Sequence, residues 1–266
     1  MKNIALALAG ARPAVAVLPT PTDPAETILD ALALPPYQAV LVVLGGAGNL
    51  DKALWPRLVP LFGRGLARAA HEAHAVIVDG GTQAGVMALM GEGLTSQGLQ
   101  TPLVGVAPAS LTTWPDNPAA DTTALEPNHS HFVLTPGTQW GSETATLFGL
   151  VQALIARPAA GGPPTGRLQP AGPGRVPALV VLAGGGGVAA IELVQAVRQR
   201  LPVLVLAGSG GLADQLAAAW ATRDTPPDDP NLAEIVADGL LRFYPITDPA
   251  PNLQRLVVRE LGADQG

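Results

Sequence analysis

The sequence contains no cysteine and is poor in aromatic and charged residues. Of its 266 residues, 4% are aromatic and 14% are charged, against about 25% charged in an average globular protein. Without cysteine, disulfides, iron–sulfur clusters and thiolate zinc sites are excluded. The few aromatic residues leave little surface on which nucleobases could stack. Lys and Arg number 15 against 21 Asp and Glu, a net charge of -6, so we expect no nucleic-acid partner.

Long apolar runs are also missing. Gly or Pro interrupts each apolar stretch before the roughly 18 residues that a membrane-spanning helix needs, so we expect no membrane insertion and a cytoplasmic location. Residues 1–11 have the composition of a short secretion signal. Because Arg12 and Pro13 follow that apolar run at once, an edge strand is the favoured interpretation.

Glycine after apolar strands is the feature that recurs. Four times a continuous apolar stretch is followed by a glycine-rich turn and then by a segment compatible with a helix. These stretches are 39–44, 75–78, 178–183 and 203–207. Continuous apolar strands are typical of a parallel sheet covered on both faces, and their alternation with helices indicates right-handed βαβ units. The predicted fold class is therefore α/β, a doubly wound, mostly parallel, Rossmann-like sheet with helices on both faces.

Further elements extend this sheet. We expect helices near 52–70, 83–90, 142–156, 188–200, 212–220 and 252–261, and further strands at 103–107, 131–135 and 241–246. A segment rich in Pro and Gly at about 157–177 predicts a flexible internal loop, and a second break is expected at 222–230. Because continuously apolar strands lie on both sides of the loop, residues 1–266 are predicted to form a single domain.

The glycine-rich turns indicate a ligand. A turn between a strand and a helix presents backbone N–H groups at the positive end of the helix dipole, and in open α/β sheets these turns lie where ligands bind. A phosphate-bearing, nucleotide-sized ligand is therefore expected. None of the turns ends in the Gly-Lys-Ser/Thr of a P-loop, and 184–187 fits the dinucleotide fingerprint only in part, so ordinary NAD binding is not expected.

Several segments resemble one known family. Residues 79–87, DGGTQAGVM, resemble the second-loop motif of the SLOG superfamily, in a prokaryotic branch close to the cytosolic N-terminal domain of melastatin-type TRP channels (TRPM). Other segments are similar to that branch in the same order: LVGVAP at 103–108, EPNHSHFVL at 126–134, GTQWGSETATL at 137–147, and the glycine turns at 180–185 and 203–214. The resemblance covers roughly residues 13–220. It implies a Rossmann-like fold that binds a nucleotide derivative, with ADP-ribose as a ligand type of the channel relatives.

The same resemblance bears on catalysis. LOG-type phosphoribohydrolases of the superfamily carry a catalytic Glu three residues after the motif Thr, and this position is Gly85 here. Asp79 stands where the LOG motif begins with Pro. A ligand sensor without catalytic residues is therefore the leading hypothesis. A hydrolase or (phospho)ribosyl transferase of the LOG type, with Asp79 or Glu143 as its carboxylate, and a scaffold without a ligand stay open as alternatives.

We expect the ligand over the turns at 45–48 and 80–82, with Asn128, His129 and His131 along one wall. No metal or required cofactor is predicted: His71 and His74 have ligand spacing, but no third ligand completes the set. The sequence leaves open whether a second copy of the chain or an effector protein is a partner. The candidate ligand-binding residues are Gly45, Gly46, Ala47, Gly48, Asp79, Gly80, Gly81, Thr82, Gly85, Pro108, Asn128, His129, His131, Glu143, Gly184, Gly185, Gly208, Ser209 and Gly210.

Overall fold

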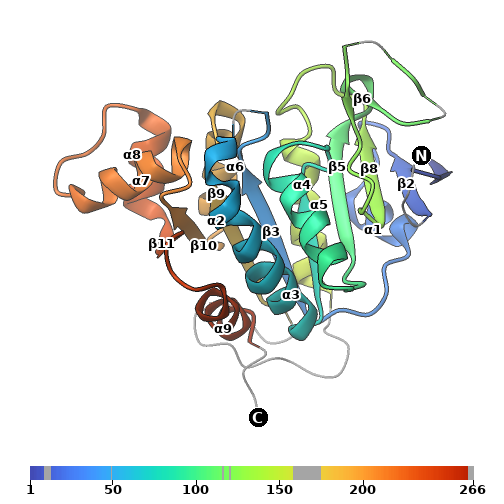
Figure 1. The fold of residues 1–266 in the computed structure, drawn as a ribbon. Coiled ribbons are helices and arrows are strands. Elements are labelled where there is room, and N and C mark those ends of the chain that lie inside the picture. Colours follow the sequence, from blue (N-terminus) through green and yellow to red (C-terminus); the bar gives the residue numbers. More distant parts are fainter. Residues whose placement is uncertain (9–12, 49, 116, 120, 158–174, 263–266) are drawn as a thin grey trace.

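The computed structural model describes residues 1–8, 13–48, 50–115, 117–119, 121–157 and 175–262. A nine-stranded sheet runs through it in the order β1-β2-β8-β5-β4-β3-β9-β10-β11 (Figure 1). The edge strand β1 (Lys2–Leu6) pairs antiparallel with β2 (Ala14–Leu18), and the other neighbours pair parallel. The expected doubly wound, mostly parallel α/β sheet is confirmed.

The direction in which the chain adds strands reverses at the centre of the sheet. From β3 (Ala39–Gly45) the chain continues on one side with β4 (Ala75–Asp79), β5 (Leu103–Pro108) and β8 (His131–Thr135). It then returns to the other side of β3 with β9 (Ala178–Ala183), β10 (Pro202–Ala207) and β11 (Leu240–Pro245). The reversal lies between β3 and β9, and ligands of open α/β sheets bind at such a point.

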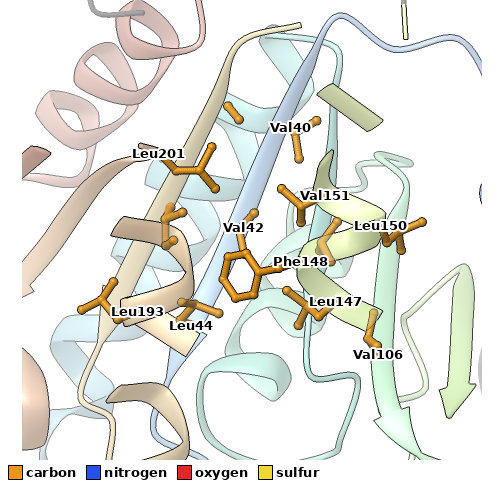
Figure 2. Packing of buried hydrophobic residues seen from close by; sticks show 14 of the residues in the cluster. Val40, Val42, Leu44, Val106, Leu147, Phe148, Leu150, Val151, Leu193 and Leu201 are labelled. Atoms are coloured by element: carbon orange, nitrogen blue, oxygen red, sulfur yellow. The ribbon is translucent and has the colours of Figure 1, made fainter. Parts of the chain in front are cut away.

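Helices cover both faces of the sheet. One face packs against α1 (Ala25–Leu32), α5 (Thr144–Ala156), α6 (Gly187–Arg198), α7 (Gly211–Ala221) and α8 (Pro230–Asp238). The other packs against α2 (Trp55–Pro60), α3 (Arg68–Glu72), α4 (Gly85–Ser96) and α9 (Ala250–Glu260). Alternate residues of β3 enter the two cores: Val42 packs near Phe148 of α5 (Figure 2), whereas Leu41 and Val43 enter the opposite core. Burial on both faces explains why β3 is apolar throughout.

Some elements differ from expectation. The helix expected near 52–70 is a succession of a 3₁₀ turn η1 (Lys52–Leu54), α2, a π-helical segment η2 (Leu61–Ala67) and α3. Strand β2 and helices α1 and α8 were not predicted. The short elements η3 (Ala109–Leu111), β6 (Thr112–Thr113) and β7 (Thr123–Ala124) follow β5. Of the loop expected at about 157–177, residues 158–174 lie outside the described part. In the part that the structure describes, no helix is long and apolar enough to span a membrane.

Candidate ligand-binding site

A cavity of about 390 Å³ opens where the strand order reverses. Its lining includes Gly45, Ala47 and Gly48 after β3, and Gly80 and Thr82 after β4. Small-molecule sites typically have volumes of about 300–1,000 Å³. The two glycine turns of the first half of the chain therefore meet at one cavity of ligand size, at the carboxyl edge of the sheet.

The opposite wall comes from segments far away in the sequence. Thr123, Trp140 and Glu143 contribute from the region between β5 and α5. Helix α6 contributes Val188, Ala189 and Glu192, whose spacing places them on one helix face. The N-terminal turn of α6, where backbone N–H groups have no partner within the helix, thus faces the glycine turns across the cavity.

Three of the candidate glycines lie beneath the cavity and allow the turns to pack. Gly81 has a φ of 68°, and a Cβ at this position would lie 2.8 Å from the Cα of Gly105. Gly85 has a φ of 51°, and its Cβ would collide with the carbonyl oxygen of Gly46. Gly46 itself is buried and donates its N–H to the carbonyl of Ala183 at 3.0 Å. A substitution at Gly81 would therefore disturb the packing of the loop itself, so a loss of binding in such a variant would not locate the ligand.

The glycine turns of the second half pack against each other instead. Ser209 Oγ accepts a hydrogen bond from the Gly184 N–H at 2.8 Å and donates one to the Leu206 carbonyl at 2.5 Å. The Gly208 N–H donates to Asp214 Oδ1 at 2.6 Å. The structure does not bring these candidates into the lining of the cavity: Gly184, Gly185, Gly208, Ser209 and Gly210.

His129 is the centre of a buried ionic cluster beside the β4 turn. The residue is 1% exposed, with Nε2 2.7 Å from Asp79 Oδ1 and Nδ1 2.7 Å from Glu126 Oε2. The ring stacks on Phe132 at 5.3 Å between centroids. Burial opposes the charged imidazolium, but the carboxylates of Asp79 and Glu126 prevail and raise the pKa of His129 to about 9. His129 is therefore a cation shared by two buried anions at neutral pH.

The remaining polar groups of the cluster fix the β4 turn to the segment before β8. Asp79 Oδ1 also accepts from the Gly81 N–H at 2.8 Å. Glu126 accepts from the backbone N–H of Asn128 at 2.9 Å and from its Nδ2 at 2.6 Å. Asp79 Oδ2 is buried without a hydrogen-bond partner among the described residues. The cluster therefore fixes the β4 turn, which contributes Gly80 and Thr82 to the cavity lining.

Several candidates for the ligand wall therefore lie elsewhere. Asp79 and His129 are buried in the cluster, and Asn128 is bound to Glu126. His131 is half-buried at the start of β8 and hydrogen-bonds Ser130 Oγ through Nδ1 at 2.8 Å. Pro108 is buried at the end of β5. None of these five residues is in the cavity lining that the structure describes.

Two carboxyl groups line the cavity, and only one of them was anticipated. Glu143, at the N-cap of α5, accepts the Gly141 N–H at 2.8 Å, and burial raises the pKa of its carboxyl. Glu192 was missed. Burial, with the nearby carboxylates of Glu143 and Asp79, raises the pKa of Glu192 to about 8. The available signal was a lone acidic residue interrupting the apolar stripe formed by Ala189, Leu193 and Ala196 in α6.

No group of three or more His, Asp or Glu side chains in the described ranges has an arrangement that could hold a metal ion.

The family described as SLOG in TRPM, prokaryote, matches residues 38–254, most of the chain and all of the cavity lining. The chain belongs to this SLOG family. A transient receptor potential cation channel subfamily M member-like 2 from Nematostella vectensis is 33% identical over 144 residues, which cover 44% of this chain and 9% of that protein. The chain thus aligns with only a small part of this relative.

Proposed function

We propose that this SLOG protein binds a phosphate-bearing nucleotide derivative of the ADP-ribose type in the cavity and acts as a ligand sensor. The observation that carries this proposal is the convergence of the β3 turn, the β4 turn and the N-terminal turn of α6 on one cavity. Backbone N–H groups at such turns stabilise phosphate oxygens. Membership of the SLOG family supports a nucleotide-related role, in binding or in processing.

The position of Gly85 argues against catalysis of the LOG type. A Cβ at this position would meet the carbonyl oxygens of Gly46 and Ala47, so the loop has no room for a Glu side chain. A second candidate function is hydrolysis of the ligand by other residues. The observation that favours it is the presence of two carboxyl groups with raised pKa values, Glu143 and Glu192, in the cavity lining.

Binding is tested by thermal shift and titration calorimetry with ADP-ribose, AMP, NAD and a cyclic dinucleotide. A ligand at 100 times its Kd stabilises the fold by about 2.7 kcal/mol, which is about 5–10 °C in Tm for a domain of this size. We expect Gly80→Val to reduce the affinity at least tenfold. A Cβ at Gly80 lies 3.6 Å from Met87 Sδ, beside the cavity, without a close backbone contact.

Gly149→Ala in α5 is the matched control, because its Cβ would also meet its nearest atom, Ala25 Cβ, at 3.6 Å but away from the cavity.

Chromatography of the same mixtures after many hours separates the two candidate functions. We expect the nucleotide to be recovered intact. Multiple-turnover release of a base or a ribose phosphate that is lost in Glu192→Gln would favour the hydrolase. Equal binding by Gly80→Val and Gly149→Ala would contradict a site at this cavity.

A further inference from the structure

One feature of the cavity has no role in phosphate binding: the carboxyl group of Glu192. Its residue is 9% exposed, it lies on the cavity-facing side of α6, and the described residues offer it no hydrogen bond. Its carboxyl oxygens are not fully buried but reach the cavity, where polar groups of this kind normally find a partner. A carboxyl that reaches a ligand-sized cavity unpartnered is suited to a partner that arrives with the ligand.

No cation among the described neighbours compensates for Glu192. Of the elements packed against α6, strands β3 and β10 contain no charged residue, and α5 carries only Glu143 at its N-cap. Helix α8 carries Glu234 and Asp238, and Glu234 pairs with Arg198 at the far end of α6, at 2.7 Å. Asp79 is paired with His129. Glu143 and Glu192 therefore form an acidic wall, facing a cavity whose other described lining residues carry no charge.

The chemistry of this wall selects what can lie against it. A carboxylate accepts hydrogen bonds from hydroxyl or amino groups and repels a phosphate, whereas the glycine turns across the cavity favour a phosphate. We propose that Glu143 and Glu192 bind the vicinal hydroxyl groups of the ligand's ribose while the glycine turns bind its phosphate. This inference rests on the proposed function and names the two halves of the same site.

Protonation of Glu192 adds a dependence on pH. Burial, together with Glu143 and Asp79, raises the pKa of Glu192 to about 8. Below this pH Glu192 is protonated, and its O–H donates a hydrogen bond to one hydroxyl oxygen of the ribose. Glu143 accepts a hydrogen bond from the neighbouring hydroxyl. Above it, Glu192 becomes a second anion, and affinity for an anionic nucleotide falls.

The test compares AMP with 2′,3′-dideoxy-AMP, which differ only in the two hydroxyl groups, by calorimetry at pH 6.5–9. We expect the wild type to prefer AMP about tenfold or more at pH 7, since a hydrogen bond to a charged group contributes about 1.5–3 kcal/mol. Glu143→Gln should remove most of this preference without weakening the binding of the dideoxy nucleotide, because the substitution removes an acceptor for the hydroxyl groups together with a charge that repels the phosphate. Glu192→Gln should retain binding at pH 7 and abolish the decline above pH 8. Glu92→Gln, an exposed residue of α4, is the control.

The outcomes separate this inference from the proposed function. Equal affinity of the wild type for both nucleotides would overturn the acidic wall as a ribose site and leave nucleotide binding intact. A preference for AMP that survives both substitutions with an unchanged pH dependence would also overturn it. Binding of neither nucleotide at millimolar concentration would overturn both proposals. If Glu143→Gln fails to fold, the preference for AMP over 2′,3′-dideoxy-AMP in Glu192→Gln and in the wild type decides.

Discussion

At the scale of single residues, the buried cluster around His129 shows what a sequence can and cannot indicate. The NHSH segment marks His129 as unusual, but its partner Asp79 lies 50 residues earlier, and nothing local in the sequence joins them. A buried ionic group is stable only while its counter-charges remain, and removal of one member leaves an uncompensated charge. His129 therefore supports the ligand-facing turn as the cation between two buried carboxylates.

His129→Gln tests this role. The amide can replace one hydrogen bond but leaves Asp79 and Glu126 buried without a cation, so we expect a loss of about 3–5 kcal/mol in the free energy of unfolding at pH 6. The measurement is urea denaturation. The control is His71→Gln, an exposed residue whose replacement should change stability by about 0.5 kcal/mol or less. Equal stability of the two variants would mean that the imidazole carries no charge in the folded protein.

Elements were predicted well where burial on both faces made the sequence continuously apolar. Strand β8 has the predicted bounds, and β9 likewise begins at Ala178 and ends at Ala183. Short amphipathic elements were missed: α1 has eight residues and α8 nine. Helix α8 did carry signals, because Asp229 accepts the Leu232 N–H at 2.8 Å as N-cap and Pro230 stands at the first position. The π-helical segment η2 packs against α4 and α9, and the local sequence pattern does not record these contacts.

The glycines of α4 and α5 give a test at this scale. Gly91 lies inside α4, and a Cβ there would collide with the carboxylate of Glu126, which the His129 cluster holds. Replacement of a mid-helix glycine by alanine ordinarily stabilises by about 1 kcal/mol. We expect Gly149→Ala to show this gain and Gly91→Ala to show a net loss of about 1–3 kcal/mol, both by thermal and urea denaturation. A gain at Gly91 would show that the cluster can move aside.

At the scale of the whole molecule, the class of the sheet was predictable but the order of its strands was not. Apolar strands that alternate with helices indicate a doubly wound sheet, whatever the order of the strands within it. The cavity exists because β9 pairs with β3, with Val42 opposite Val180, and this pairing places α6 beside the turns of the first half. Glu192 reaches the site only through this long-range arrangement, which is why local motifs identified the glycine turns and Glu143 but missed Glu192.

The pH dependence of stability follows from the two buried groups taken together. His129 has a folded pKa of about 9 against 6.5, so its contribution is complete below pH 6.5 and is lost as pH rises through 9. Glu192 has a folded pKa of about 8 against 4.5, and its proton is released on unfolding, so stability falls from pH 4.5 to 8. Each group removes about 1.4 kcal/mol per pH unit in its range.

Because both effects have the same sign, their slopes add between pH 6.5 and 8. We expect the Tm of the ligand-free protein to fall by about 10–20 °C from pH 6 to pH 8.5 at constant ionic strength, measured by calorimetry. Glu192→Gln carries no titrating carboxyl, so it should be more stable than the wild type at pH 8 and should show the shallower slope of His129 alone. At pH 4.5 its advantage should nearly vanish, since Glu192 is then protonated in the folded chain and half protonated in the unfolded one. A wild-type Tm that stays constant from pH 6.5 to 8 would mean that neither group holds its proton as the buried geometry requires.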